Sequence, residues 1–180
     1  MIQVRFAGLG GQGIILMGEI LGEAAVMEKK YVGQTASYGA EARGSACRSD
    51  VVISESWIDY PEVTEADILG CMSQGTYEQN KAKVNAAGGI IFIDTQMIKP
   101  DPSITLKQIP VPATERALKD LGNRMVANII MLGVVAKRTG IISIEALRAT
   151  LEERLSPKLR EVNLKALESA LSYEQERDAS

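Results

Sequence analysis

The fold is decided by residues 6–14, which read Phe6-Ala7-Gly8-Leu9-Gly10-Gly11-Gln12-Gly13-Ile14. An apolar strand over 2–7 enters a turn with glycines spaced Gly8-x-Gly10-x-x-Gly13, and apolar residues at helical spacing then predict a helix over 13–27. Glycines at this spacing permit a tight turn, a close backbone approach to a pyrophosphate, and contact between helix and strand. The start of such a helix favours an anion by about 0.3 to 2 kcal/mol. The stretch therefore favours a nucleotide-like ligand, although a glycine turn of this kind can also be purely structural.

Strand and helix patterns continue along the chain. Apolar runs predict strands over 31–32, 50–54, 67–72, 90–94 and 104–111, with a long polar loop over 33–45. Helical spacing predicts helices over 76–86 and 114–121, an apolar helix from 125 onward, a helix over 143–155 with Ser143 as its cap, and a last helix that begins at Pro157.

This alternation predicts an α/β fold: a doubly wound, Rossmann-like, mostly parallel sheet with helices on both faces and a helical C-terminal part. Gly18 and Gly22 lie one turn apart on the first helix, which allows its backbone to approach the sheet. We expect a single Rossmann-like domain over 1–173, followed by a polar C-terminal tail over 174–180 that frays.

The helix that begins near Met125 is apolar almost all round. A helix without a clear polar face is either buried in the core or covered by a partner, and the sequence leaves both interpretations open. A homodimer of the isolated chain also stays open. The plain interpretation of the two asparagines at its start is a helix cap for Asn123 and a buried hydrogen bond for Asn128.

Composition excludes several kinds of chemistry. The formal net charge is −3 and the basic residues are dispersed, so nothing indicates binding to nucleic acid. No apolar run approaches the roughly 18 residues needed to span a bilayer, and no basic segment precedes a hydrophobic one at the N-terminus. We therefore expect a cytoplasmic protein that does not contact membranes.

The chain contains no histidine, so no Ser-His or Cys-His nucleophile pair and no imidazole metal site can form within it. Its two cysteines, Cys47 and Cys71, form no CxxC pair and are too few to ligate an iron–sulfur cluster. Both are expected to be reduced core residues. Any redox or carbon–carbon chemistry should therefore depend on cofactors held by other chains.

A second candidate segment, 33–45, follows the second strand, where doubly wound folds place residues that face a ligand. It carries one fixed cation, Arg43. A clamp on phosphate or carboxylate is one interpretation, because a charge-assisted hydrogen bond contributes about 1.5 to 3 kcal/mol. A surface ion pair with Glu41 or Asp50 is the other, and the residues alone do not decide between them.

Taken together, these segments resemble a known family. The stretches GLGGQGI over 8–14, QTASYGAEARG over 34–44, VVIS over 51–54, and the segment 123–133 are similar to the gamma subunit of the 2-oxoacid:ferredoxin oxidoreductases. Ser37-Tyr38-Gly39 is closer to the 2-oxoglutarate and general 2-oxoacid branch than to the pyruvate branch. Ser45 departs from the family pattern, which usually has a second glycine after Arg-Gly.

The resemblance implies a role for this chain within a larger enzyme. In that family the assembled complex converts a 2-oxoacid to an acyl-coenzyme A and reduces ferredoxin. Thiamine diphosphate, magnesium and the iron–sulfur clusters are expected on partner subunits. The gamma subunit is expected to contribute to assembly and to the coenzyme A side of the active site, and the isolated chain is expected to be inactive.

The implied coenzyme A contacts fall on the two loop motifs, with no catalytic and no metal-binding residue in this chain. They are Gly8, Gly10, Gly11, Gln12, Gly13, Tyr38, Arg43, Gly44 and Ser45. Gln12 either points toward the ligand or braces the loop, and Tyr38 either stacks on an adenine or packs. Glu41 is interpreted as a residue that orients Arg43.

Two other functions compete with this one. A stand-alone NAD(P)-dependent oxidoreductase usually has an acidic residue about 20 positions after the glycine motif, at the end of the second strand. Glu28 is near that count but precedes the strand, which disfavours this function; a contact between Arg43 and the 2′-phosphate of NADP stays open. A regulatory nucleotide-binding module is the second alternative.

Overall fold

The structure is a computed structural model that describes residues 1–39 and 44–178. Its elements are β1 (Ile2–Leu9), α1 (Ile14–Met27), β2 (Tyr31–Tyr38), β3 (Ala46–Ser54), β4 (Ile68–Cys71), α2 (Gln74–Asn80), β5 (Ile90–Asp94), β6 (Lys107–Val111), α3 (Ala113–Leu121), the short 3-10 helix η1 (Arg124–Val126), α4 (Ala127–Thr139), α5 (Ile144–Arg154) and α6 (Pro157–Asp178).

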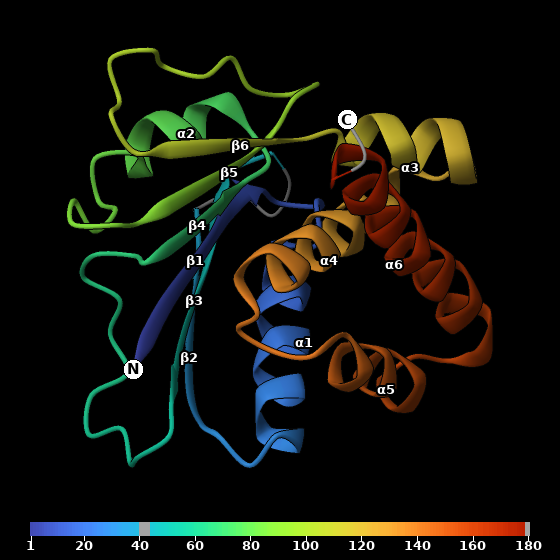
Figure 1. The fold of residues 1–180 in the computed structure, drawn as a ribbon, viewed down its shortest axis with the longest axis horizontal. Helices are drawn as coiled ribbons and strands as arrows, with labels where there is room; N and C mark the ends of the chain where they lie inside the picture. Colours follow the sequence, from blue (N-terminus) through green and yellow to red (C-terminus); the bar gives the residue numbers. More distant parts are fainter. Residues whose placement is uncertain (40–43, 179–180) are drawn as a thin grey trace.

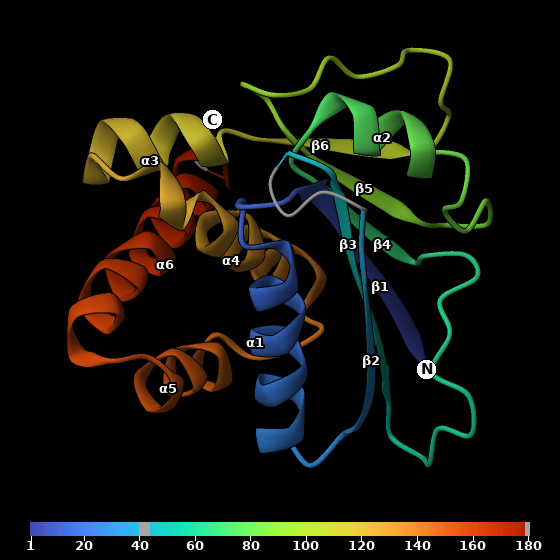
Figure 2. The ribbon, with the colours of Figure 1, turned by 180° about the vertical axis from the view of Figure 1, so that it is seen from behind.

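Within the described residues, the strands form one sheet in the order β2-β3-β1-β4-β5-β6. Neighbouring strands from β1 through β4 and β5 to β6 pair in parallel, whereas β3 is antiparallel to both β1 and β2. Helices α1, α3, α4, α5 and α6 lie on one side of the sheet and α2 on the other (Figures 1 and 2). The predicted α/β class with helices on both faces is confirmed.

The segment 33–45 differs most from the expectation of a polar loop. Residues 33–38 belong to β2, which pairs antiparallel with β3 from Ala46 onward, so the first part of this segment is strand rather than loop. The small uncharged residues have weak strand preference by themselves. Pairing across the hairpin, as between Thr35 and Asp50, decides their conformation instead.

A charged pair that the sequence did not reveal lies within the sheet. Arg5 of β1 and Asp50 of β3 are register partners, and Arg5 Nε and Nη2 each donate to Asp50 at 2.8 Å. Arg5 Nη2 also donates to the carbonyl of Val63, and both charged residues are at most 3% exposed. Since a buried charge is tolerated only when it is paired and hydrogen-bonded, this pair ties β1, β3 and the loop before β4 together.

Helix α2 ends at Asn80, six residues earlier than Ala86, where the pattern predicts its end. Val84, which the pattern placed in this helix, instead lies in a parallel bridge with Ala66 and is buried. The apolar environment beside the sheet therefore takes precedence over helical spacing at this point.

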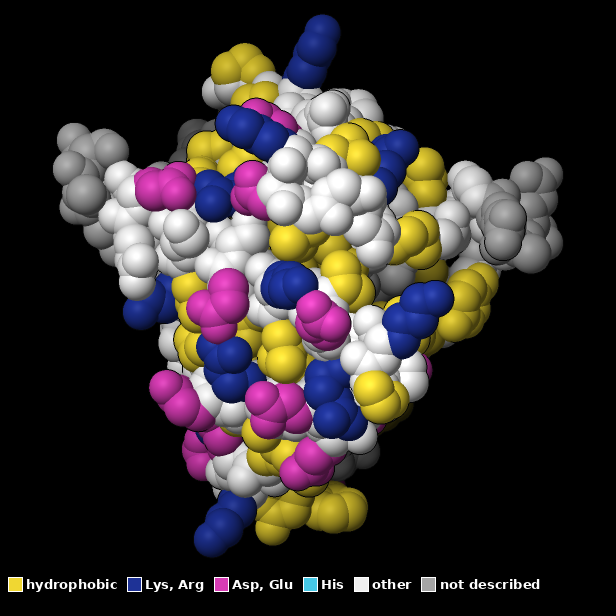
Figure 3. Space-filling view, turned by 90° about the vertical axis from the view of Figure 1, so that its right-hand side faces the viewer, with side chains coloured by type: hydrophobic (Ala, Val, Ile, Leu, Met, Phe, Trp, Pro, Cys, Tyr) yellow, Lys and Arg dark blue, Asp and Glu magenta, His cyan; other side chains and the backbone are white. Residues whose placement is uncertain are grey.

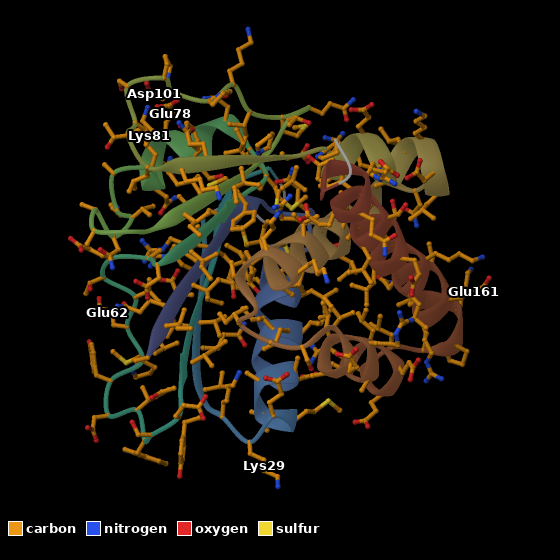
Figure 4. The ribbon with its side chains drawn as sticks, viewed as in Figure 1. Lys29, Glu62, Glu78, Lys81, Asp101 and Glu161 are labelled. Atoms are coloured by element: carbon orange, nitrogen blue, oxygen red, sulfur yellow. The ribbon has the colours of Figure 1, made fainter. Side chains whose placement is uncertain are left out.

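The irregular connection between β5 and β6 is fastened to α2. Lys81 Nζ lies 2.7 Å from Asp101 Oδ2 and also pairs with Glu78 (Figure 4). Tyr77 is fully buried and accepts from the Asp101 N–H while it donates to Gln108. The hydrogen bond between Lys81 and Asp101 is the largest cause that raises the pKa of Lys81 and lowers the pKa of Asp101.

Helix α4 is a core element. Every residue from Val126 to Ala136 is buried, with Ile129, Ile130, Met131 and Leu132 fully inaccessible. Because α1, α3, α5 and α6 surround this helix, its apolar surface is covered within the chain itself. Of the two interpretations left open by the sequence, the structure supports the core.

Helix α6 begins at Pro157 as predicted but does not end near Tyr173. It continues to Asp178, and Glu174 is 2% exposed and forms an ion pair with Arg138 of α4. The expectation of a frayed tail from residue 174 is therefore wrong up to 178, because a polar side chain there has a partner on another helix.

The outer face of the helical layer carries intermingled basic and acidic side chains (Figure 3).

The C-terminal end of α1 is attached to α5 by Glu28. Its carboxylate accepts from Lys30 Nζ at 2.8 Å and from the Ser143 N–H at 2.6 Å, while Ser143 Oγ caps α5 by accepting from Ala146 N. Partial burial alone would raise the pKa of Glu28, but the hydrogen bonds from Lys30 and Ser143 outweigh it and lower the pKa to about 2.

Gly133 on α4 tests the packing of the core. A Cβ at this position would lie 2.8 Å from Ala170 Cβ of α6, so Gly133→Ala should lower the free energy of unfolding by about 1–3 kcal/mol. Gly75→Ala in α2 is the matched control, since a Cβ there meets nothing within 4 Å, and its stability should stay equal or rise by up to about 1 kcal/mol. Denaturant unfolding measures both. Equal effects from the two variants would contradict the described contact between α4 and α6.

Glu28 should contribute to the pH dependence of stability. Its pKa is lower in the folded chain than its ordinary value of 4.5, so its contribution is complete above that pH and is lost as pH falls toward about 2. Glu28→Gln should be less stable than the parent chain at pH 7 and should show a smaller stability loss between pH 5 and about 2. Unfolding curves at several pH values test this. Glu152→Gln, a change at an exposed position of α5, should leave the parent's pH dependence intact.

Candidate functional site

The glycine loop lies at the carboxyl end of β1, next to β4. The chain leaves β1 through α1 toward β2 on one side of the sheet and later continues from β4 toward β6 on the other. The strand order therefore reverses between β1 and β4, which is where open α/β sheets bind ligands. Gly11 and Gly13 have φ angles of 96° and 74°, a backbone region that favours glycine.

Gln12 braces this loop. Its Oε1 accepts from the Leu9 N–H at 2.6 Å, and its Nε2 donates to the carbonyl of Met72 at 2.9 Å. Both ends of the amide are thus bound to backbone groups of β1 and of the segment after β4. The structure supports the bracing interpretation of Gln12.

Gly8 and Gly13 serve close packing around the loop. A Cβ on Gly8 would lie 2.6 Å from both Gln12 Oε1 and Ile14 Cδ1, and one on Gly13 would lie 2.3 Å from Asn128 Nδ2. Asn128 is 2% exposed and donates to the carbonyl of Gly13 at 3.2 Å, so it makes the buried hydrogen bond that was expected. These contacts fix where α1 begins relative to α4.

The end of the β2–β3 hairpin lies against the glycine loop. Gly10 N donates to the carbonyl of Ser45 at 2.9 Å, and Gly44 N lies 3.5 Å from the carbonyl of Gly10. Gly44 has a φ of 80°, which favours glycine here too. The two segments that the sequence singled out are therefore neighbours, joined by backbone hydrogen bonds.

A crevice of about 460 Å³ opens beside this junction. Its lining combines the glycine loop, the hairpin end, the segments after β4 and β5, and the starts of α3 and α4: Leu9, Gly10, Gly11, Gln12, Gly44, Met72, Met97, Thr114, Arg124, Met125 and Ala127. Of the predicted site residues, Gly10, Gly11, Gln12 and Gly44 line the crevice. Gly8, Gly13 and Ser45 are not among its lining residues.

Arg124 is a crevice residue that the sequence interpretation missed. It stands in η1, directly after Asn123, whose Oδ1 accepts from Met125 N at 3.0 Å and so caps this helical start as expected. Its Nη2 lies 3.3 Å from Met97 Sδ, and the side chain is exposed. In the sequence, Arg124 is only a single basic residue at the start of an apolar helix, and this does not indicate that it lies near Gly10 in the folded chain.

Asp94 supports the far wall of the crevice. This residue ends β5, is fully buried, and accepts from both the N–H and the hydroxyl of Thr114. Burial raises the pKa of Asp94, and the hydrogen bonds from Thr114 and Gln96 oppose that rise. Asp94 therefore holds the first turn of α3 in place and does not line the crevice itself.

Other predicted residues stand apart from this crevice. Tyr38 is 69% exposed, so within the described residues it neither packs nor lines the crevice. Arg43 and Glu41 lie outside the described residues. Asp50, named as one surface partner for Arg43, is buried and pairs with Arg5 and with Arg48.

The described residues contain neither a metal-binding group of side chains nor an activated thiol. Residues 1–39 and 44–178 hold no group of three or more His, Cys, Asp or Glu side chains that could bind a metal. Cys47 and Cys71 are buried, unpaired cysteines, as expected, and burial raises the pKa of both thiols. No helix in these ranges has the length and apolar character to cross a membrane.

The structure disfavours a stand-alone NAD(P)-dependent oxidoreductase, because Glu28 lies far from the glycine loop. Glu28 lies just beyond the C-terminal end of α1, whereas the glycine loop precedes the N-terminal end of the same helix. Its carboxylate is bound to Lys30 and Ser143. A ribose held at the glycine loop would be a full helix length away from this carboxylate.

Comparisons with known proteins identify the family of this chain. The family of pyruvate ferredoxin/flavodoxin oxidoreductases matches residues 3–173. The 2-oxoglutarate synthase subunit KorC of Methanocaldococcus jannaschii is 40% identical over 167 residues, which cover 91% of this chain and 89% of that protein.

Solved structures show the same fold. The keto/oxoacid ferredoxin oxidoreductase gamma subunit from Geobacter sulfurreducens has a TM-score of 0.83 and 32% identity, and the match covers 96% of this chain and 97% of that one. The 2-oxoglutarate:ferredoxin oxidoreductase of Magnetococcus marinus, solved with 2-oxoglutarate, coenzyme A and succinyl-CoA bound, has a TM-score of 0.85 and 23% identity, and the match covers 95% of this chain and 30% of that one. The chain belongs to the pyruvate ferredoxin/flavodoxin oxidoreductase family, as a gamma subunit of the 2-oxoacid:ferredoxin oxidoreductases.

Proposed function

We propose that this chain works inside a multi-subunit 2-oxoacid:ferredoxin oxidoreductase, where its crevice holds phosphate groups of coenzyme A. The observation that carries this proposal is the meeting of the glycine loop, the hairpin end and Arg124 around one crevice. Coenzyme A supplies the thiol that accepts the acyl group. Thiamine diphosphate, magnesium and the iron–sulfur clusters are proposed to reside on companion subunits.

The crevice offers groups suited to an anion. No described residue accepts a hydrogen bond from the N–H of Gly11, which is exposed on the crevice wall. The positive end of the α1 dipole lies behind the glycine loop. Arg124 forms no ion pair with any residue in the described ranges, so its guanidinium is available to a phosphate.

The same lining argues against catalysis by this chain. Apart from Arg124, its described side chains are apolar, or they are Gln12 and Thr114, whose polar atoms are already bound to protein groups. None of them can act as a nucleophile with an adjacent base. The proposed role is therefore to bind and orient coenzyme A for a reaction carried out on other chains. The proposal places the pocket for the 2-oxoacid mainly on other chains.

The subunit role is tested by purification of the tagged chain from its native host. We expect it to purify with companion subunits that carry thiamine diphosphate and iron–sulfur clusters, and to show no oxidoreductase activity after separation from them. A solitary chain that catalyses the reaction would overturn the proposal. The cytoplasmic location expected from the sequence stays a prediction, which fractionation of the same host would test.

The coenzyme A role is tested in the assembled enzyme by Arg124→Gln. Loss of a charge-assisted hydrogen bond of about 1.5 to 3 kcal/mol should raise the KM for coenzyme A by roughly 10- to 100-fold. Decarboxylation measured without coenzyme A should be unchanged. Arg43→Ala is expected to act in the same way.

Arg148→Gln is the matched control, because Arg148 pairs with Glu168 on the helical layer and does not line the crevice. It should leave both steps unchanged. An equal loss of both steps in the Arg124 and Arg43 variants would mean that these residues are structural.

A further inference from the structure

Strand β2 has one unpaired edge. It stands at the end of the strand order, with β3 on its other side. In an antiparallel pair, successive residues direct their N–H and C=O groups alternately toward and away from the partner strand. Gly39 N donates to Ala46 O and continues the register of β2 with β3, so odd-numbered residues of β2 bond to β3. The backbone groups of Val32, Gln34, Ala36 and Tyr38 therefore point out of the sheet.

Nothing within the described chain satisfies or shields this edge. None of the described residues forms a hydrogen bond with these outward backbone groups. The strand reads Tyr-Val-Gly-Gln-Thr-Ala-Ser-Tyr over 31–38, without a charge or a proline. Natural proteins usually protect an edge of this length with lysines, prolines or a covering segment. An unprotected edge of eight residues is thus suited to strand addition.

A groove runs beside this edge on the side of α1. It has a volume of about 690 Å³ and lies between α1, α5 and β2, with Val32 and Gln34 of β2 in its wall. Val26 and Met27 of α1 also line it and are 58% and 40% exposed. A strand added to β2 would direct every second side chain into this groove.

The groove is acidic. It is lined by the carboxylates of Glu19, Glu23 and Glu153 and by a single guanidinium, that of Arg154. Arg154 pairs with both Glu19 and Glu23. The uncompensated negative charge, next to exposed apolar side chains, matches a segment with basic and apolar side chains on one face.

We propose that the free edge of β2 receives an extended segment of a companion subunit, which adds a strand to the sheet and places basic and apolar side chains in the groove. The inference rests on the proposed subunit role. A second copy of this chain is a poor occupant, because its own β2 carries no basic side chain and two acidic grooves would lie side by side.

Amide hydrogen exchange, resolved to single residues, tests the strand addition in the wild-type chain. In the isolated chain the amides of Val32, Gln34 and Ala36 should exchange fast, while those of Gly33 and Thr35 are protected by β3. In the assembled complex the outward amides should slow by about 100-fold or more. Unchanged exchange on assembly would overturn the proposal. So would protection that appears in the isolated chain with rising concentration, because a second copy would then cover the edge.

Ala36→Pro tests the edge by mutation. Proline removes an outward N–H and leaves the bonds to β3 in place, so the chain should still fold. It should bind the companion subunits at least about tenfold more weakly, whereas Ala36→Ser, which keeps the N–H, should bind normally. Assembly of a folded Ala36→Pro chain at wild-type affinity would overturn the inference. If this variant does not fold, the exchange pattern of the wild-type chain decides.

Glu153→Lys tests the charge of the groove. It should weaken assembly by about tenfold through repulsion of basic side chains. Glu152→Lys is the matched control, since Glu152 is the preceding residue of α5 and does not line the groove. Equal effects of the two would contradict a basic occupant. If the wild-type chain itself binds no companion subunit, the subunit role is wrong. If the wild-type chain binds and only the variants bind more weakly, the subunit role holds and the result bears on the strand addition alone.

Discussion

The structure depends on the position of β3, which pairs antiparallel between β1 and β2. Because β3 is joined to β2 by a hairpin, this pairing carries the hairpin end to the carboxyl end of β1. There Ser45 accepts a hydrogen bond from Gly10, which brings the end of the second motif against the glycine loop. The buried pair of Arg5 and Asp50, directly across β1 and β3, favours this register because a shift by one residue would leave both charges unpaired.

The site around this junction is built by division of labour among its residues. Gly8 and Gly13 leave room for neighbouring side chains. Gln12 binds the loop to the segment after β4, and Asp94 holds the start of α3. These residues are occupied with protein contacts. The backbone of Gly11 and the guanidinium of Arg124 line the same crevice, and they are the groups that we propose for a phosphate. This arrangement is the basis of the proposed role, in which the chain binds and orients coenzyme A.

Much of the fold could be predicted from local signals. The start of α1 followed from the glycine spacing, the cap at Ser143 and the start of α6 at Pro157 followed from end signals, and the family followed from two motifs together. The length of β2 could not be predicted, because Gln34 to Ser37 have little strand preference and acquire it from β3. Arg124 was missed for a related reason: only the folded chain brings residue 124 next to residue 10. The end of α6 was missed because Glu174 is polar, and its partner Arg138 is 36 positions away in the sequence.

The complete enclosure of α4 has a consequence for how the enzyme is put together. Its apolar surface is covered by helices of the same polypeptide, so no companion is needed to shield it from water. We therefore expect the newly made chain to fold before it meets the other polypeptides. We then expect assembly to join subunits that are already folded.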